Sequence, residues 1–245
     1  AVVKTGAPVE LKGIFRNLGG NTVTSADINY QINGGTTVTK PVTPTNPNLA
    51  TGGRIEFKST NAWTPSADGE YDVKLWIDNI NGQPDQQNDN DTLNYKVQAS
   101  TVVPERMVVI EEKTGSWCGW CPRGFVGMDY MDSAYHSSVI PIAVHNADPM
   151  VDSEYDGNIG AVAPGGYPGS AVDRVLGPDP NPQDLENAYN ERIDIIPSAT
   201  VEFEGVFKDL STNEVTVDVK STFVTDLSNI DYRYAAVIIE DSVTG

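Results

Sequence analysis

The amino-acid sequence predicts a multidomain protein built of β and α/β parts. Three observations support this fold class. Short runs that alternate apolar and polar residues fill the first part of the chain; an apolar strand, a helical stretch and a second apolar strand follow; and alternation returns near the end. Domains typically hold about 100–150 residues, so 245 residues suggest two or three of them. We expect a β-sandwich over residues 1–99, an α/β domain over 104–197, and strands of an incomplete β-sandwich over 198–245.

The composition narrows the class of protein. Lys and Arg number 16 and Asp and Glu 34, a net charge of −18, which excludes a nucleic-acid binder because little positive charge could neutralise phosphates. Hydrophobic residues make up 39% and aromatic residues 8%, which indicates a folded chain. No apolar stretch approaches the roughly 18 residues of a membrane span. The first residues do not form a leader in which an apolar stretch follows a charged one, and a mature or trimmed chain would look the same. The small number of lysines favours an extracytoplasmic protein.

The N-terminal part carries the pattern of strands joined by turns. The clearest run is Tyr71–Asp78, in which every second side chain is apolar, so one face of the strand is apolar and the other polar. Residues 26–32 and 55–58 alternate in the same way, and Asn33-Gly34-Gly35 is a hairpin-turn signal. A further strand is expected over Leu93–Val97. Turn signals at about 8–12-residue spacing predict an immunoglobulin-like antiparallel sandwich.

An acidic, amide-rich tract over residues 83–91 precedes the last of these strands. Calcium prefers hard oxygen ligands, so Asp85, Asp89 and Asp91 are candidate calcium ligands. The tract lacks the order of an EF-hand loop, because no Gly or Glu stands at the later loop positions. The favoured alternative is a turn in which Asp and Asn side chains hydrogen-bond their own backbone.

The middle of the chain carries a βαβ pattern. Met107–Ile110 is an apolar run typical of a strand buried on both faces, and a helical stretch and a second apolar strand, Val139–His145, follow it. Such a unit forms a parallel pair of strands with a right-handed crossover. After an acidic loop, we expect a short strand over Ala171–Arg174 and then a helix over residues 184–195, with Asp184 as its N-cap.

Alternation returns after Pro197 in three runs, Val201–Glu204, Val215–Lys220 and Tyr232–Ile239. Three strands are too few to close a sandwich by themselves. Either the sequence is a fragment of a longer chain, which we favour, or these strands pack on another sheet.

Both cysteines lie in one motif, WCGWCP at residues 117–122, after the buried strand and at the start of a helix. Backbone N–H groups at a helix N-terminus favour a thiolate, so Cys118 would be present as the species that attacks disulfides. Cys121 lies one turn further on and would resolve a mixed disulfide by attacking Cys118. Pro122 fits the first turn of a helix because it lacks an N–H. Gly119 leaves the attacking sulfur unshielded.

A CxxC motif beside a βαβ pattern is typical of a thioredoxin-like redox site. Structural zinc is disfavoured because it needs four ligands, and the only histidines, His136 and His145, lie further apart than the about three to five residues of zinc fingers. His136, near the end of the helix, is explained by its favourable interaction with the helix dipole. An oxidised and inert CxxC stays open as an alternative, because a fold does not guarantee an activity.

The motif is specific enough to indicate a family. The loop Thr114–Pro122 resembles the active-site loop of thioredoxin-like proteins. Together with GYPGSAVDR at residues 166–174, it is similar to the outer-membrane-protein-twenty-eight-related family of Gram-negative bacteria, whose members place a thioredoxin-like domain between β-rich modules. This resemblance covers mainly residues 106–245. The N-terminal part resembles a CARDB-type adhesion module through Asn17–Gly20 and Asn88–Asp91.

The resemblance implies the roles of four catalytic residues. Cys118 matches the attacking cysteine and Cys121 the resolving one. Pro168 matches the cis-proline that faces the disulfide. Glu112 matches the buried acid, which would relay the proton of Cys121 through water. The family also implies a periplasmic, outer-membrane-associated or secreted protein at the cell surface.

Three features depart from the thioredoxin pattern. Gly119 and Trp120 separate the cysteines where thioredoxin has Gly-Pro, so its redox potential does not carry over. Glu111 is an equally suitable acid, and one of Glu111 and Glu112 should face solvent because side chains alternate along a strand. Tyr167, the residue before the proline, is bulky enough to restrict substrate approach.

For further side chains near the motif, the sequence allows two roles each. His145 ends a strand at the sheet edge where ligands gather; it either stabilises the Cys118 thiolate or, as we favour, hydrogen-bonds the backbone. Trp117 and Trp120 should form an exposed apolar patch that, with Tyr167, contacts substrate or packs under a neighbouring domain. Four acids of the following segment are expected to form a solvated loop, with a metal role as the alternative: Asp148, Asp152, Glu154 and Asp156.

Two functions follow from the sequence. The first is an extracytoplasmic thiol–disulfide oxidoreductase that acts on protein thiols or disulfides through Cys118 and Cys121, with the redox-active disulfide as its only redox group. The second is a non-enzymatic adhesion or scaffold protein of the cell surface that binds a surface partner and keeps an inert thioredoxin-like domain.

Overall fold

The computed structural model describes residues 1–42, 49–58, 62–85, 87, 89–209, 211–212, 214–224 and 232–240. These residues form a sheet-rich structure of twelve strands and three α-helices. Two compact units are distinct: one holds Ala1–Pro104 with the strands that follow Ser198, and the other holds Glu105–Pro197 with residues 232–240. Among the residues described, no helix has the length and apolar character needed to span a membrane. Asn88 of the expected CARDB-type pattern lies outside the described residues.

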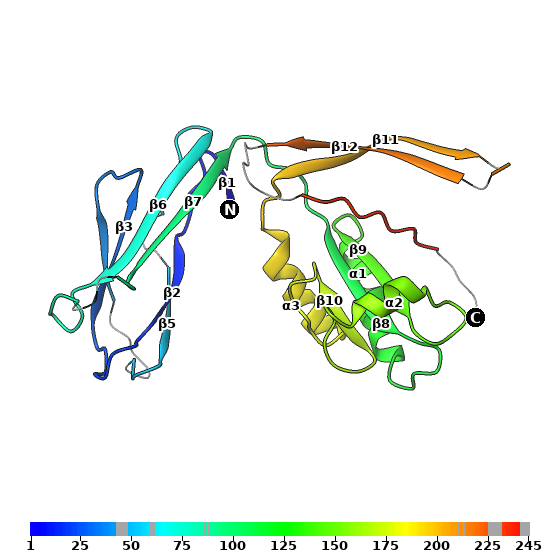
Figure 1. Ribbon diagram of the computed structural model, residues 1–245, viewed down its shortest axis with the longest axis horizontal. Coiled ribbons are helices and arrows are strands. Elements are labelled where there is room, and N and C mark those ends of the chain that lie inside the picture. The colour runs from blue at the N-terminus through cyan, green and yellow to red at the C-terminus, as the bar shows by residue number, and fades with distance from the viewer. Residues whose placement is uncertain are drawn as a thin grey trace. The chain divides into compact units, whose positions relative to one another are not determined.

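The N-terminal module contains two sheets (Figure 1). The strands of the larger sheet are, in spatial order, β1 (Val2–Lys4), β7 (Thr92–Ser100), β6 (Gly69–Asp78), β3 (Ala26–Ile32) and β4 (Val38–Val42). The smaller sheet pairs β2 (Lys12–Arg16) with β5 (Arg54–Lys58). All pairs are antiparallel except β1 with β7, which is parallel.

The alternating residues of this module form its core. Val73 and Leu75 of β6 are almost fully buried, whereas the charged residues beside them are exposed. They pack with apolar side chains from several other segments of the module: Leu11, Ile28, Tyr30 and Val97, with Phe15 of β2 partly buried against them. The turn between β3 and β4 holds Asn33 and Gly34 at positive φ, which confirms the hairpin predicted from Asn-Gly-Gly. An antiparallel β-sandwich is therefore present.

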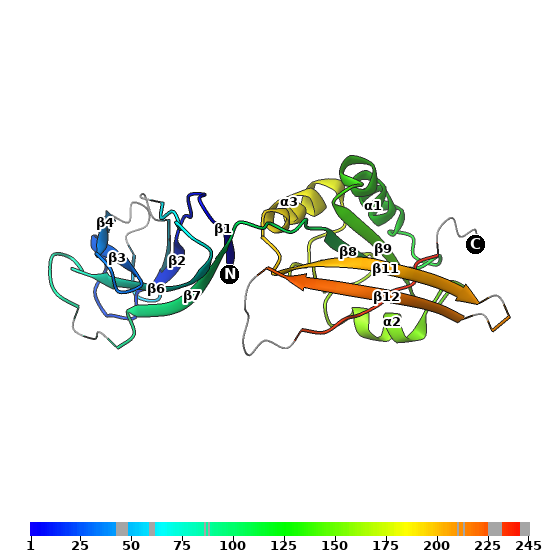
Figure 2. The same cartoon turned by 90° about the horizontal axis from the view of Figure 1, so that it is seen from above.

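The second unit is a three-stranded sheet between helices. Its strands lie in the order β10 (Gly169–Val172), β8 (Val108–Thr114) and β9 (Val139–His145), with β8 and β9 parallel and β10 antiparallel to β8. Figure 2 shows α1 (Pro122–Tyr135) and α3 (Pro182–Ile193) on one face and α2 (Ser153–Ile159) on the other. Separate apolar clusters fill the two faces, one around Met131 and Leu185 and one around Ile142 and Ile159. The βαβ unit is confirmed.

Two boundaries of this unit differ from the sequence prediction. The N-cap of α3 is Asn181, not Asp184, because the Asn181 side chain accepts the Asp184 N–H at 3.0 Å and Pro182 occupies the first helical turn. The strand expected over Ala171–Arg174 ends two residues earlier, because Asp173 and Arg174 adopt positive φ and turn the chain.

The last strands form a hairpin of β11 (Ala199–Asp209) and β12 (Glu214–Phe223), which pair antiparallel. The prediction of a third strand at Tyr232–Ile239 is wrong within the described residues, because 232–240 adopt no regular secondary structure. An apolar run has the composition of a strand, but a strand forms only where a neighbour takes up its backbone hydrogen bonds.

Candidate active site around a disulfide

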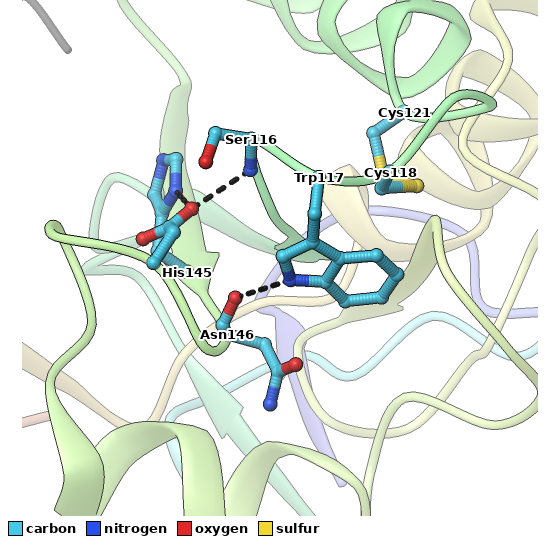
Figure 3. The surroundings of a disulfide bond; sticks show 7 residues. Ser116, Trp117, Cys118, Cys121, His145 and Asn146 are labelled. Carbon is cyan, nitrogen blue, oxygen red and sulfur yellow. Dashed lines mark hydrogen bonds and ion pairs between the residues drawn. A yellow bond between two sulfur atoms is a disulfide. The ribbon is translucent and has the colours of Figure 1, made fainter.

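Cys118 and Cys121 are joined by a disulfide, with 5.4 Å between their Cα atoms (Figure 3). The chain turns tightly before the helix: the Cys118 N–H donates to the Gly115 carbonyl and the Cys121 N–H to the Cys118 carbonyl. Helix α1 then begins at Pro122 with Cys121 as its N-cap. The helix starts at the second cysteine, as Pro122 predicts, but Cys118 lies in the turn before the N-cap and not at the helix N-terminus where we expected it. Cys118 is 9% exposed and Cys121 5%.

Aromatic side chains surround this disulfide, as expected. Trp117 is 53% exposed although its indole Nε1 donates to the Asn146 carbonyl at 2.6 Å, and Trp120 is 77% exposed. The position that a Cβ at Gly119 would take meets nothing within 4 Å. A side chain at position 119 would therefore point into open space.

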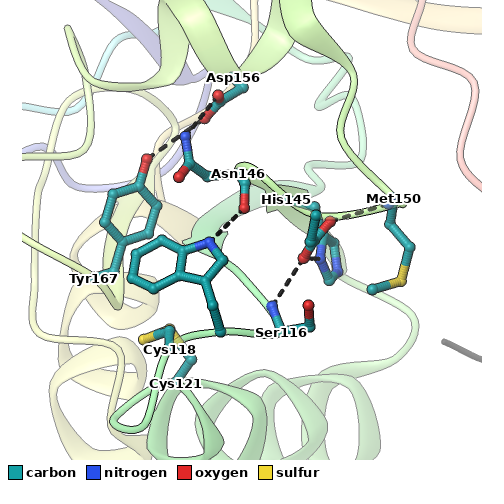
Figure 4. Close-up of polar contacts among 10 residues, drawn as sticks. Ser116, Cys118, Cys121, His145, Asn146, Met150, Asp156 and Tyr167 are labelled. Carbon is teal, nitrogen blue, oxygen red and sulfur yellow. Dashed lines mark hydrogen bonds and ion pairs between the residues drawn. A yellow bond between two sulfur atoms is a disulfide. The ribbon is translucent and has the colours of Figure 1, made fainter.

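The chain segment around Pro168 reaches the same place. The Tyr167–Pro168 peptide is cis, as predicted, and the Tyr167 ring lies edge-on to Trp117 with 5.2 Å between centroids (Figure 4). A Cβ placed on Gly124 of α1 would come within 3.1 Å of Pro168 Cβ. The fold thus brings the expected proline and its preceding tyrosine to the helix that follows the cysteines.

Glu112 is buried directly behind this helix. Among the described residues, its Oε1 has no hydrogen-bond partner, and a Cβ on Gly124 would come within 1.9 Å of that oxygen. Burial disfavours the carboxylate and raises the pKa of Glu112 to about 7. Glu112 can therefore gain or release a proton near neutral pH.

The expectation that Glu111 or Glu112 faces solvent is wrong, because helices cover both faces of β8 and both side chains are buried. Glu111 points to the other face, where Arg174 donates from Nε at 2.9 Å and from Nη2 at 2.6 Å, and Tyr155 donates its hydroxyl hydrogen. Although burial opposes it, these hydrogen bonds hold the pKa of Glu111 below its ordinary value. Only Glu112 faces the helix that Cys121 caps.

His145 takes neither expected role. Its Nδ1 lies 2.7 Å from Asp148 Oδ2, and the same oxygen accepts the Ser116 N–H at 2.8 Å, while Oδ1 accepts the Met150 N–H (Figure 4). Although burial opposes it, these contacts lower the pKa of Asp148. The buried Asp148 carboxylate therefore ties the end of β9 to the residues before Cys118.

The segment with the four acids is not simply a solvated loop. Besides Asp148, Asp152 accepts the Tyr155 N–H at 2.8 Å as N-cap of α2, and Asp156 accepts a hydrogen bond from Asn146. Asp152 stays exposed although it caps the helix, and Glu154 is exposed as expected. The structural roles of these carboxylates could not be predicted from the sequence, because the fold sets their hydrogen-bond partners.

Sequence reasoning also missed Asn146 and Lys113. Asn146 follows β9 directly, at the sheet edge where ligands gather, and that position was its only signal. Lys113 is buried in β8, donates from Nζ to the Gly165 carbonyl at 2.7 Å, and lies 5.3 Å from the centroid of the Tyr167 ring. Its position directly after Glu112, the candidate buried acid, was its only signal.

The metal candidates are not gathered into a site. Asp85 Oδ1 accepts the Gln87 N–H, and Asp91 Oδ1 accepts the Thr92 hydroxyl, which is the pattern of turn residues. Within the described ranges, no three or more His, Cys, Asp or Glu side chains are placed to hold a metal ion. His136 pairs with Asp132 at the end of α1.

No protein-family model matches this chain, and no curated protein matches it. Among solved structures, it is similar to the CARDB domain of the PF1109 protein from Pyrococcus furiosus. The crystal structure of that domain, in complex with di-metal ions, is 23% identical, with 40% of this chain and 83% of that chain covered and a TM-score of 0.33. The solution NMR structure of the same domain is 25% identical, with 41% and 87% covered and a TM-score of 0.33.

Proposed function

We propose that the protein is an extracytoplasmic thiol–disulfide oxidoreductase whose thioredoxin-like domain spans residues 104–197. One observation carries the proposal: the Cys118–Cys121 disulfide precedes a helix whose first turn packs against Pro168 and against the buried carboxyl of Glu112, whose Oε1 has no hydrogen-bond partner among the described residues. A dithiol beside a group that titrates near pH 7 has what thiol–disulfide exchange needs.

In the reduced protein, the Cys118 thiolate attacks one sulfur of a substrate disulfide, and the other substrate sulfur leaves as a thiolate. The Cys121 thiol then passes its proton toward Glu112 and attacks Cys118. The second substrate sulfur leaves, and the Cys118–Cys121 disulfide forms again. Two electrons move from the protein dithiol to the substrate, and the same steps in reverse oxidise a substrate dithiol.

The family resemblance extends this proposal to the whole chain. The motifs at residues 114–122 and 166–174 support a protein of the outer-membrane-protein-twenty-eight-related type, located in the periplasm, at the outer membrane or outside the cell. In such a protein the N-terminal CARDB-type module would hold the redox domain near its protein substrates.

A second function is favoured by one observation, the near-complete burial of both cysteines. A buried disulfide is shielded from attack, so the domain would be an inert scaffold and the chain an adhesion protein. In that case Cys118→Ala would lower the melting temperature and leave the binding of a surface partner unchanged.

Turnover decides between the two functions. The full chain should catalyse reduction of insulin disulfides by dithiothreitol, and Cys118→Ala should abolish that catalysis. Cys121→Ala should accumulate a mixed disulfide with substrate, because Cys118 attacks but nothing resolves the product. A wild-type chain that shows no turnover and whose disulfide resists glutathione would refute the oxidoreductase.

A further inference from the structure

A closed ring of contacts links the residue before Cys118 to the residue before Pro168 (Figure 4). Trp117 Nε1 donates to the Asn146 carbonyl at 2.6 Å, and Asn146 Nδ2 donates to Asp156 Oδ2 at 2.8 Å. The Tyr167 hydroxyl donates to Asp156 Oδ1 at 3.4 Å, and the Tyr167 ring closes the circle against Trp117. The four side chains come from four separate segments of the second unit.

The ring has support on two sides. Lys113 holds the Gly165 carbonyl with its Nζ and lies 5.3 Å from the Tyr167 ring centroid, a distance at which a cation is attracted to an aromatic face. A Cβ at Gly115 would come within 2.6 Å of Trp117 Nε1 and 3.0 Å of the Asn146 carbonyl. The hydrogen bond between Trp117 and Asn146 therefore requires glycine at position 115.

Trp117 combines exposure with a fixed orientation. An exposed side chain that contacts a ligand normally loses rotamer freedom on binding, which weakens the affinity. Here the indole N–H is already bonded and the ring is already packed on Tyr167, while half of the side chain remains open. Binding to this surface would need little further ordering.

We infer that Asn146 and Asp156 are positioning residues that hold Trp117 and Tyr167 as one rigid aromatic wall beside Cys118. The inference rests on the proposed function, because the wall would contact the polypeptide that carries the substrate disulfide. Asn146 and Asp156 act through the two aromatic residues, so their loss weakens substrate binding and leaves the exchange step intact.

The first test compares Asp156→Ala and Asn146→Ala with wild type on a peptide disulfide. The KM should rise about 3- to 10-fold, with kcat within about twofold, because ordering of the wall is then required on binding. Asp156→Asn keeps one acceptor oxygen and should recover part of the loss. The matched control is Glu154→Ala, which removes an exposed acid from the same helix and should keep the wild-type KM.

The second test is a double-mutant cycle of Trp117→Phe with Asp156→Ala. The indole and the carboxylate are joined only through Asn146 and Tyr167, so a working ring makes their effects on KM non-additive. Additive effects, or a KM for the ring variants equal to that of Glu154→Ala, would overturn the inference while the oxidoreductase stands.

A third readout is independent of turnover. In the oxidised wild type, the Trp117 indole N–H should exchange with solvent more slowly than that of Trp120, and Asp156→Ala should speed its exchange. Equal exchange of Trp117 in wild type and variant overturns the positioning role. If the protein fails to reduce insulin but the Trp117 N–H is protected from exchange, the proposed function is overturned and the positioning role of Asn146 and Asp156 is retained.

Discussion

Glu112 is a buried carboxyl whose pKa is raised by its burial. Its pKa is about 7 in the folded protein and 4.5 for the ordinary side chain, because burial disfavours the charged form. The folded state therefore holds this proton more tightly than the unfolded state does. This contribution to stability is fully present below pH 4.5, falls as the pH rises from 4.5 to about 7, and is lost above that.

Glu112→Gln should remove this pH dependence, because the amide keeps the shape and does not titrate. Between pH 4.5 and 8, the free energy of unfolding of the wild type should fall relative to the variant by on the order of 3 kcal/mol. Urea unfolding at several pH values measures the difference. Identical pH dependence in the two proteins would show that the carboxyl titrates normally.

A substitution at Gly124 tests the close packing of helix α1 on the Glu112 carboxyl. Ala normally improves a helix interior by about 1 kcal/mol over Gly. At Gly124, however, the new Cβ would meet Glu112 Oε1 at 1.9 Å, so we expect Gly124→Ala to destabilise the fold by about 1–3 kcal/mol. Gly119→Ala, where the same methyl meets nothing within 4 Å, is the control. Thermal unfolding compares them; an equally stable Gly124→Ala protein would place the carboxyl elsewhere.

At the scale of elements, alternation along the sequence predicts β3 and β6 because every second side chain enters a core. Alternation wrongly predicts that Glu111 or Glu112 faces solvent, because the helices that cover both faces of β8 come later in the chain. It fails for Tyr232–Ile239 because strand formation needs a partner strand. The CxxC helix start was predictable from Pro122, whereas the contacts of Asp148 and Asn146 depend on the fold.

The cap of α3 tests one of these corrections. Asn181→Ala should cost about 1 kcal/mol of unfolding free energy, because the cap accepts the Asp184 N–H. Asp184→Ala should cost less, about 0.3–1 kcal/mol, because Asn181 still caps the helix; the substitution removes a first-turn charge that favours the helix dipole and the hydrogen bond that Asp184 Oδ2 accepts from Asn181 Nδ2. Chemical denaturation gives both values, and the reverse order would restore Asp184 as the cap.

At the scale of the whole molecule, acidity is the dominant feature. The charge of −18 extends to residues 105–197, where five Lys and Arg face fifteen Asp and Glu. Those five basic side chains are engaged: Arg106 and Arg192 pair with Asp173, Arg123 with Asp179 and Arg174 with Glu111, and Lys113 bonds the Gly165 carbonyl. We therefore expect a negative field around the disulfide.

This field should select among small disulfides. The reduced protein should react faster with cystamine, which is cationic, than with dithiodipropionate, which is anionic and similar in size, because opposite charges raise the encounter rate. The ratio of the two rates should fall toward one as salt rises to about 1 M, where the screening length is about 3 Å. Stopped-flow tryptophan fluorescence measures both rates. A ratio that does not change with salt would contradict steering by charge.

The reduction potential of Cys118–Cys121 in the full chain tests the central claim most directly. Equilibration in glutathione and dithiothreitol buffers, with the thiols quantified by alkylation, gives this value. An oxidoreductase should show a reversible two-electron couple between about −120 and −270 mV, the range of known thiol–disulfide oxidoreductases. A disulfide that stays oxidised below about −300 mV, as structural disulfides do, would contradict the account.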